Sequence, residues 1–472
     1  MNRRDAITIS THVKAVERPV PPAGEAGYWI DPVPFPSPGA AWSMVGILFM
    51  LSIISVLDRN IITLLVGPIK QDFGLTDVQM SLLIGAAFSV PFGVLSIPLG
   101  WAIDRFERRP IVAAGIAVWS FATVATGMAR TYTELFIARC FVGAGDATLA
   151  PANSSLLSDL FPRQKLALPM ALASMGFKAG QGAALIVGGL LTLWIAPTVI
   201  YDVPLLGDLK GWQLIFVVVG LPGLLFIPLI YSVREPLRRG TDPTRGRDGA
   251  SYRDYIRFIR DNPRFFAGHH LGVFLLITMA YTLIAWMPSY LTRVHGWDET
   301  TAGSLLGSAF LVGPLIGMPI HGAATDWLFR RGISDAHLRY PLFAVLLGAP
   351  VGITALLVDS PNTAVMLAGL YTFVISGYVS LPLTALVGIT PSRLRGKAAA
   401  FVGLACATTG TLAGPLLVGL LTDKVFRDPL MVGTSIMICI ACLAPTIALC
   451  FGIALKPLRD AGPVTAGRAT SH

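Results

Sequence analysis

Five ionisable side chains lie inside long apolar stretches of this sequence, where a charge is costly. They are Asp58, Arg59, Arg139, Asp146 and Lys178, and all fall in the first half of the chain. At the centre of a bilayer a charge costs about 2.5–3.5 kcal/mol on insertion scales, so residues of this kind are functional candidates. Basic residues outnumber acidic ones in this set, which favours an anionic ligand. The apolar stretches of the second half contain no charged residue, so we expect that half to supply an apolar and aromatic wall.

Asp58, Arg139 and Asp146 form a candidate proton switch. Arg139 and Asp146 are two helical turns apart, so they share one face of a helix and are separated by roughly 10 Å along its axis. Burial favours the protonated carboxyl and a nearby guanidinium favours the ionised one, so a movement of Arg139 between the two carboxylates would move a proton. The sequence therefore predicts proton coupling through these three residues. The alternative is a buried Asp58–Arg139 pair that only holds two helices together.

A second group of residues is expected to bind substrate. Lys178 lies near the middle of its apolar stretch with Gln181 almost one turn further on, and an ammonium there suits a phosphate or carboxylate. The alternative for Lys178 is a pair with Asp146. Arg59 projects about 100° away from Asp58 around the helix, so we expect it to face another helix rather than the cavity. The full predicted binding set is Arg139, Lys178, Gln181, Tyr281, Tyr371 and Tyr378, with core packing as the alternative for each tyrosine.

The elements that must position these residues are transmembrane helices. The chain has 472 residues, of which 54% are hydrophobic and only 13% are charged, and its mean hydropathy is +0.66. Soluble domains carry about 25% charged residues, so a water-soluble enzyme is excluded. A helix of about 20 apolar residues crosses a bilayer. Stretches of that length occur at 41–68, 78–101, 110–129, 133–157, 167–194, 212–233, 266–291, 301–325, 340–358, 362–389, 398–421 and 432–455.

The stretches divide into two groups of six, which predicts an all-α integral membrane protein. The expected order is a disordered tail at 1–40, a six-helix bundle at 41–233, a basic linker at 234–264 with a short interfacial helix at 252–260, a second bundle at 265–456 and a tail at 457–472. Lys and Arg concentrate on the side that holds the linker and both tails. The positive-inside rule therefore predicts a multi-pass protein of the plasma (inner) membrane with both termini in the cytoplasm. The net charge of +9 follows this topology, so no nucleic acid partner is expected.

Two motifs repeat between the halves, as expected for an internal duplication. Gly100-x-x-x-Asp104-x-x-x-Arg108-Arg109 ends the second stretch, and Gly322-x-x-x-Asp326-x-x-x-Arg330-Arg331 ends the eighth. Gly176-x-x-x-Gly180 in the fifth stretch corresponds to Gly410-x-x-x-Gly414 in the eleventh. Small residues at this spacing let membrane helices pack closely.

These motifs carry a family resemblance that covers about residues 41–456. The segment Gly100-Trp-Ala-Ile-Asp104-Arg105-Phe-Glu-Arg108-Arg109 resembles the signature loop of the major facilitator superfamily. Leu57-Asp58-Arg59, Arg139-x-x-x-Gly143-x-Gly145-Asp146-Ala147 and Gly419-Leu-Leu-Thr-Asp423 are similar to the spinster-like branch, although that branch usually has Glu where this chain has Asp146. The resemblance implies two pseudosymmetric six-helix bundles.

The repeated loops are expected to act as latches. Asp104 is predicted to contact the N-terminus of the helix that follows Pro391, and Asp326 that of the helix after Pro162, because helix N-termini attract carboxylates. The resemblance implies that Arg108 contacts Asp159. The predicted gating set is Gly100, Asp104, Arg105, Arg108, Arg109, Asp159, Gly322, Asp326, Arg330 and Arg331, with topology enforcement as the alternative for the arginines.

Together these features predict a secondary active transporter that works by alternating access and is driven by protons. The spinster-like resemblance implies an anionic amphipathic solute, such as a lysophospholipid or a sphingoid phosphate; the alternative is a small organic anion or a drug-like compound. We expect a monomer in the lipid bilayer, with no cofactor, no metal and no catalytic residue. A membrane enzyme or a transport-dead receptor is the rival of another class. The spacing of His321 and Asp326 is weak support for an acyltransferase, and His269 and His270 are expected to lie at the membrane interface.

Overall fold

The computed structural model describes residues 35–162, 165–238, 252–377, 380–391 and 394–461. Twelve helical segments of this described chain are long and apolar enough to cross a membrane, and they coincide with the twelve predicted stretches. The predicted all-α fold with twelve spans is confirmed. Of the tail predicted at 1–40, residues 1–34 lie outside the described residues, and the first helix begins at Pro38, within the predicted tail. Residues 239–251 of the linker and 462–472 of the second tail also lie outside the described residues.

The first half holds six spans, several of them broken. In chain order its elements are α1 (Pro38–Asn60), the 3₁₀ turn η1 (Ile61–Thr63), α2 (Val66–Phe73), α3 (Asp77–Ile84), α4 (Ala86–Arg105), α5 (Arg108–Met128), α6 (Tyr132–Asp146), α7 (Leu149–Leu160), α8 (Ala167–Trp194), α9 (Gly211–Gly220), η3 (Pro222–Leu225) and α10 (Phe226–Ser232). Between α8 and α9 the strands β1 (Ile200–Val203) and β2 (Gly207–Lys210) pair antiparallel, with Ile200 opposite Lys210.

The second half repeats this plan after a short linker helix. Its elements are α11 (Tyr252–Asp261), α12 (Pro263–Val294), α13 (Glu299–Arg330), α14 (Ala336–Ala355), α15 (Pro361–Ile375), α16 (Ser380–Ile389), α17 (Arg395–Leu420), the π-helical turn η4 (Leu421–Phe426), η5 (Pro429–Met431) and α18 (Val432–Ala461). The linker helix α11 forms where a short interfacial helix is predicted. The helix α18 continues to Ala461, past the predicted boundary at 456, and Leu458 in this last part packs into the core.

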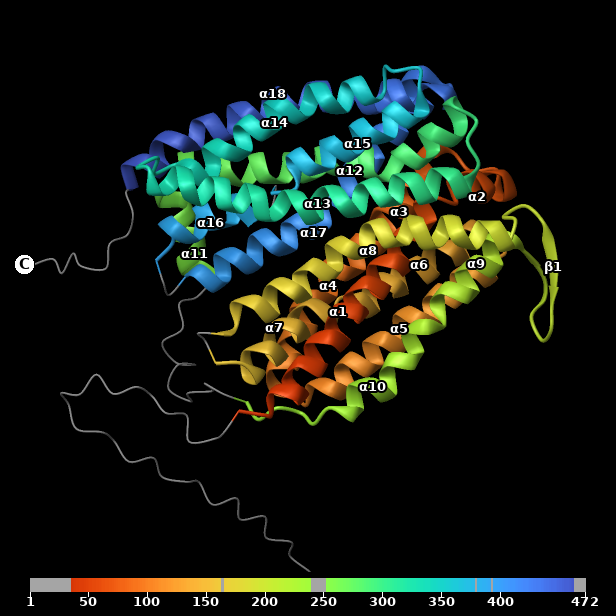
Figure 1. Ribbon diagram of the computed structural model, residues 1–472, viewed down its shortest axis with the longest axis horizontal. Helices are drawn as coiled ribbons and strands as arrows, with labels where there is room; N and C mark the ends of the chain where they lie inside the picture. The colour runs from red at the N-terminus through yellow and green to blue at the C-terminus, as the bar shows by residue number, and fades with distance from the viewer. Residues whose placement is uncertain (1–34, 163–164, 239–251, 378–379, 392–393, 462–472) are drawn as a thin grey trace, which may run out of the picture. The chain divides into compact units, whose positions relative to one another are not determined.

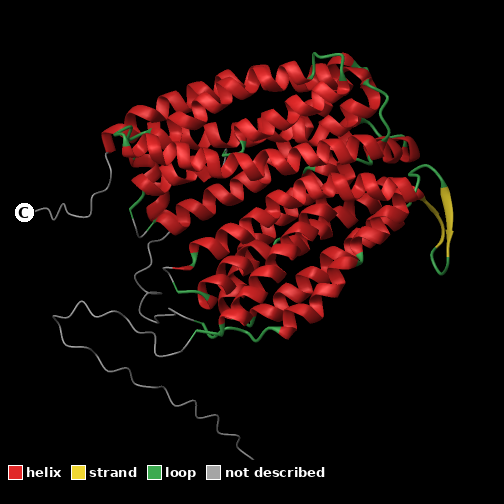
Figure 2. Cartoon of the chain, in the orientation of Figure 1, coloured by secondary structure: helices red, strands yellow, loops and turns green. Residues whose placement is uncertain are grey.

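The helices of the two halves lie side by side as two bundles (Figures 1 and 2). The β1–β2 hairpin and α2 lie at one end of the spans, which we call the hairpin side. The helices α10 and α11 and the last turn of α18 lie at the opposite end, which we call the terminal side. The connection from η1 to α3 and the end of α12 therefore meet at the hairpin side.

Glycines set how closely the helices approach. A Cβ on Gly176 or Gly180 would collide with α1, and a Cβ on Gly410 or Gly414 would collide with α12. Lipid tails are as apolar as the helix surfaces, so close packing rather than hydrophobicity drives helix association in a membrane. The predicted close-packing role of both glycine pairs is confirmed. In the first half this contact packs α8 directly against α1.

Candidate functional site

The centre of the site is a cavity between the two halves, and Arg59 lines it. The empty space between its walls is about 390 Å³, a volume that includes open solvent. Its walls are Arg59, Asn60, Thr63, Ile84, Gln181 and Leu185 from the first half, and Tyr281, Ile284, Ala285, Phe310 and Thr411 from the second. The Arg59 guanidinium lies 4.3 Å from the centre of the Phe88 ring and donates a 3.4 Å hydrogen bond to the Tyr281 hydroxyl.

Our expectation that Arg59 faces another helix was therefore wrong. The 100° step around the helix correctly separates Arg59 from Asp58, whose side chain is buried within the first half. It ignored the length of the arginine side chain, whose stem extends along apolar surface while the charged end reaches a polar partner. Arg59 is thus a cavity residue that the sequence analysis left out of the binding set.

Arg139 and Asp58 are both fully buried, but they do not form the predicted ion pair. Arg139 donates to the main-chain oxygens of Asp58 and Arg59, at 3.2 and 2.7 Å. These carbonyls belong to the last turn of α1, where helical partners are missing, so Arg139 caps that helix. Asp58 Oδ2 accepts a 3.5 Å hydrogen bond from Thr123, and no described residue donates to Asp58 Oδ1. The charges of Arg139 and Asp146 still act on Asp58.

Asp146 is the last residue of α6 and lies buried against α1. Its Oδ1 accepts a hydrogen bond from the Ser55 hydroxyl. Arg59 is a cation whose charge acts on Asp146. The Asp146 carboxylate is thus within electrostatic reach of the arginine that lines the cavity.

Lys178 and Gln181 line a second cavity of about 330 Å³ that adjoins the first. The cavities share Gln181, Ile284 and Phe310, and the second continues between the halves along Pro314, Thr372, Ile375 and Ser376. The Tyr281 phenol and the Arg59 guanidinium both act electrostatically on Lys178. No described residue accepts from Gln181 Nε2, which is buried.

The three tyrosines predicted to bind substrate differ in where they lie. Tyr281 lines the first cavity, as expected. Tyr371 does not line either cavity: it is fully buried within the second bundle, where its hydroxyl donates to the Met279 carbonyl at 3.3 Å and its ring packs on Gly352. Core packing, the stated alternative, describes Tyr371. Tyr378 lies outside the described residues.

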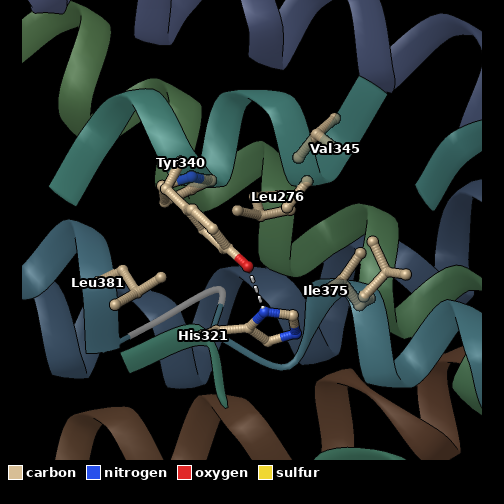
Figure 3. Close-up of a pocket in the computed structure, with 10 residues that line it drawn as sticks. Leu276, His321, Tyr340, Val345, Ile375 and Leu381 are labelled. Atoms are coloured by element: carbon tan, nitrogen blue, oxygen red, sulfur yellow. Dashed lines mark hydrogen bonds between the residues drawn. The ribbon is translucent and has the colours of Figure 1, made fainter. Parts of the chain in front are cut away.

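His321 lies in the interior of the second bundle, where both of its ring nitrogens have hydrogen-bond partners. His321 and Tyr340 border a cavity of about 240 Å³ inside the second bundle (Figure 3), where His321 Nδ1 lies 2.7 Å from the Tyr340 hydroxyl. Its Nε2 lies 2.7 Å from the Phe373 carbonyl, so both ring nitrogens are engaged. Asp326 is exposed and does not join His321.

His269 and His270 are both buried in the protein beside the linker helix, and their expected place at the membrane interface stays a prediction. His269 is hydrogen-bonded to the Pro382 carbonyl and to His270, and His270 to the Tyr255 hydroxyl of α11. Burial also raises the pKa of the Tyr255 phenol. These contacts fasten the linker helix to the second bundle, because they connect α11 through α12 to α16.

An ion pair that the sequence analysis missed joins the halves at the hairpin side. Asp77, at the start of α3, is fully buried and accepts two hydrogen bonds from Arg293 of α12, at 2.8 and 2.9 Å. Lys70 of the first half also contacts the Asp77 carboxylate. Asp77 follows a helix-capping threonine, and Arg293 counts as an ordinary outer-loop cation, so no local pattern links them.

Further hydrogen bonds strengthen this junction. Asp423 in η4 accepts a 2.6 Å hydrogen bond from the main-chain nitrogen of Val78 across the halves. The Ser81 hydroxyl donates to the Pro415 carbonyl at 2.8 Å, and the hydroxyls of Thr192 and Thr300 lie 2.8 Å apart. The hairpin side is therefore closed by contacts between the halves.

At the terminal side, Arg108 is buried in a cluster within the first half. It contacts Asp159, as the resemblance implies, and also donates to Glu235 at 2.6 Å and to the Pro236 carbonyl at 2.9 Å. Glu235 accepts from the main-chain nitrogens of Arg108 and Arg109 as well, so it caps the N-terminus of α5. Sequence reasoning missed Glu235, which lies in the basic linker.

The other predicted gating residues are held less tightly. Asp104 and Asp326 are exposed, and Asp326 lies 3.7 Å from His337 of its own half. Arg105 and Arg331 stack over Trp101 and Trp327, at 5.6 and 3.9 Å. Arg109 also contacts Glu107, and Arg330 donates to the Asp326 carbonyl. Among the described residues, which omit 163–164 and 392–393 near those helix N-termini, no hydrogen bond or ion pair joins Asp104 or Asp326 to the other half. Their gating role stays a prediction, as does that of Gly100 and Gly322.

A family model described as Major Facilitator Superfamily matches residues 48–415. The chain belongs to this superfamily. It is 24% identical over 429 residues to an MFS-type efflux pump from Mycolicibacterium smegmatis, an alignment that covers 88% of this chain and 93% of the pump. It is 25% identical over 418 residues to the D-galactonate transporter of Escherichia coli O6:H1, covering 84% and 93% of the two chains.

Among solved structures, this superfamily member resembles a bacterial homologue of the human lysosomal transporter Spinster. That crystal structure is in an inward-facing and unoccupied conformation; the TM-score is 0.78 at 21% identity, over 92% of this chain and 100% of the other. The spinster-like resemblance read from the motifs is confirmed. These relatives are transporters, and a multi-pass membrane transporter of this superfamily is what the fold and family together establish.

Proposed function

We propose that this protein moves an anionic amphipathic solute by alternating access and couples that movement to protons. The observation that carries the proposal is the asymmetry of the central cavities. Cationic side chains line them from the first half, whereas the second half contributes mainly apolar and aromatic groups. A ligand with a charged head and an apolar tail matches these two walls.

The cationic wall favours an anion. Arg59 and Lys178 are close enough for each charge to act on the other. Two like charges near the middle of a membrane repel each other at low dielectric, so the arrangement is stabilised when an anion lies between them. Gln181 adds a buried amide donor that no described residue satisfies.

The opposite wall favours an apolar tail. Ile284 and Phe310 border both cavities, and Pro314 and Ile375 extend the apolar surface deeper between the halves. Burying an alkyl chain there contributes about 0.8 kcal/mol for each methylene removed from water. A lysophospholipid or a sphingoid phosphate has this combination of head and tail.

The proton coupling that we propose rests on competition for Arg59. The guanidinium lines the cavity and also acts on the Asp146 carboxylate behind it. When an anionic head binds Arg59, Asp146 loses part of its counter-charge and gains affinity for a proton. The charges of both Arg139 and Asp146 act on Asp58, so a change of protonation at Asp146 is felt at Asp58.

The two gates then alternate. In the conformation described here the Asp77–Arg293 pair closes the hairpin side. We assign the terminal side to the cytoplasm because Lys and Arg concentrate there. On that assignment this is an inward-facing conformation, and the reverse state would break the hairpin-side contacts and bring Asp104 and Asp326 to the helix N-termini across the interface.

A small organic anion is the second candidate substrate. Asn60, Thr63, Tyr281 and Thr411 give the first cavity several hydroxyl and amide groups beside Arg59. Such groups suit a polyhydroxylated acid, and a relative named as a D-galactonate transporter aligns over most of the chain.

Transport by purified protein in liposomes tests the proposal. Labelled lysophospholipid, sphingosine phosphate and D-galactonate would be offered under counterflow and under an imposed pH gradient. We expect counterflow of an amphipathic anion, faster net uptake with a proton gradient, and loss of both in Arg59→Gln. Exchange of galactonate alone would keep the transporter and reject the lipid. Failure of every anion to exchange across the sealed bilayer would favour the receptor or enzyme instead, and hydrolysis or acyl transfer would separate those two.

A further inference from the structure

We propose that Ser55, Ser52 and Asn153 form a proton path between Asp146 and the terminal side. The inference rests on the proposed proton coupling and adds the route by which a proton reaches the buried carboxylate. A buried acid exchanges protons with water only through groups that both donate and accept hydrogen bonds. The first bundle places such groups in a row.

The row follows one face of α1. Asp58, Ser55 and Ser52 are successive at a spacing of three residues, so their side chains lie on the same side of the helix. From Asp58 to Ser52 they span about 9 Å along the axis toward the terminal side, at about 1.5 Å per residue. The row therefore begins at the coupled carboxylates and runs in the direction that a proton from the cytoplasm must travel.

Neighbouring helices complete the row with polar partners. The Ser55 hydroxyl donates to Asp146 Oδ1, and Asn153 Nδ2 of α7 donates to Ser52 Oγ at 3.3 Å. All four side chains are buried, with at most 5% of any of them exposed. Ser52 in turn donates to the Leu48 carbonyl at 2.8 Å, one turn closer to the terminal side.

Asn153 has an unsatisfied polar atom, which packing alone does not explain. Its Oδ1 is buried, and no described residue donates to it. An unsatisfied buried acceptor costs about 1–3 kcal/mol, so native proteins satisfy such atoms, frequently with ordered water. A water donating to Asn153 Oδ1 beside Ser52 would extend the row with a group that both accepts and donates protons.

Small size alone does not explain these residues. Ser52 lies where Gly176 of α8 packs against α1, and alanine would fit that space as well. Ser55 donates to a carboxylate rather than to the carbonyl of its own preceding turn, which is the usual partner of a helical serine in a membrane. Asn153 is neither small nor apolar.

The transfer conserves protons and charge. A hydronium at the Asn153–Ser52 end passes a proton through water to Ser55 Oγ, while Ser55 gives its own hydroxyl proton to the ionised Asp146. The hydronium becomes water, Asp146 becomes a neutral acid, and Ser55 regains its hydroxyl. The charged groups that act on this site are Arg59 and Asp58 from α1 and Arg139 from α6, and substrate binding changes only the first of them.

The experiment compares Ser55→Ala and Asn153→Ala with Ser43→Ala, a matched control whose serine is on α1 but is exposed. Each variant is reconstituted in liposomes, with the substrate identified for the wild type. Net uptake driven by a pH gradient, proton influx reported by an internal pH dye, and counterflow are measured. We expect pH-driven uptake and proton influx to fall by about 10-fold or more in both path variants. Counterflow should stay near the wild-type rate, and Ser55→Thr, which keeps the hydroxyl, should restore proton influx.

The outcomes separate this inference from the proposed function. Wild-type uptake that ignores the pH gradient refutes the proton coupling itself. Wild-type coupling together with unchanged proton influx in Ser55→Ala and Asn153→Ala refutes only the path. If Ser55→Ala fails to fold, Asn153→Ala and Ser55→Thr carry the same comparison. Equal loss of uptake and counterflow would assign these residues a structural role and overturn the proposal.

Discussion

Replacing Arg293 by glutamine should open the hairpin side of this transporter to solvent more often. Arg293 belongs to the second half and Asp77 to the first, so their two hydrogen bonds exist only while the halves are closed at that side. In the opposite conformation the pair is already broken. The substitution therefore removes free energy from one state and leaves the other unchanged.

The size of the effect follows from the geometry. A hydrogen bond to a charged group contributes about 1.5–3 kcal/mol. Two such bonds are lost, but Lys70 continues to neutralise Asp77, and the Arg293 side chain is 14% exposed and partly solvated. We therefore take about 1.5–3 kcal/mol for the pair as a whole. Since 1.4 kcal/mol is a factor of ten, the equilibrium should shift about 10- to 100-fold toward the state open at the hairpin side.

The assay is the rate at which an impermeant maleimide labels a cysteine placed at Thr63. This residue lines the first cavity and is buried. The five native cysteines would first be replaced, and the reagent would be added only at the hairpin side of sealed vesicles. The labelling rate is proportional to the open population, so it should rise by the same 10- to 100-fold in Arg293→Gln.

Lys70→Gln is the matched control. Lys70 contacts the same carboxylate, but it belongs to the same half as Asp77, so its contact persists in both conformations. Its replacement should leave the labelling rate near that of the parent. Equal acceleration by Lys70→Gln and Arg293→Gln, or no acceleration by Arg293→Gln, would refute the assignment of this pair as a gate.

Three further outcomes are expected from the site and its supports. Arg59→Gln should weaken binding of anionic substrates by about 10-fold or more while sparing neutral analogues, as measured by ligand-induced thermal stabilisation; equal loss for both classes would make Arg59 structural. Asp58→Asn should abolish pH-driven uptake but retain counterflow, and an unchanged pH response would remove Asp58 from the coupling. Arg108→Ala should destabilise the protein by about 3–5 kcal/mol because it removes a fully buried guanidinium that pairs with both Asp159 and Glu235. A wild-type melting temperature for that variant would show that the cluster adds little to stability.

Much of the architecture could be predicted because it depends on local pattern. The length of the apolar stretches determines the spans, since a bilayer has a defined thickness. The Gly176–Gly180 and Gly410–Gly414 pairs predicted close helix pairs, and the structure bears these out. The repeated loop motif predicted two groups of six spans, and the twelve spans agree with it. The cost of a charge in hydrocarbon likewise singled out the ionisable residues near the cavity, which is a property of each residue by itself.

The tertiary structure alone decided which partners these residues contact. Helical periodicity predicted which face Arg59 and Arg139 occupy, but their long side chains reach a cavity and a helix end that periodicity does not describe. Asp77 and Arg293 are separated by 216 positions and meet only because two bundles close on each other. Tyr371 lies in the core because the face of its helix that carries it points into the second bundle. Local sequence thus determines the helices and the cost of their charges, whereas the identity of each partner depends on packing between segments distant in the chain.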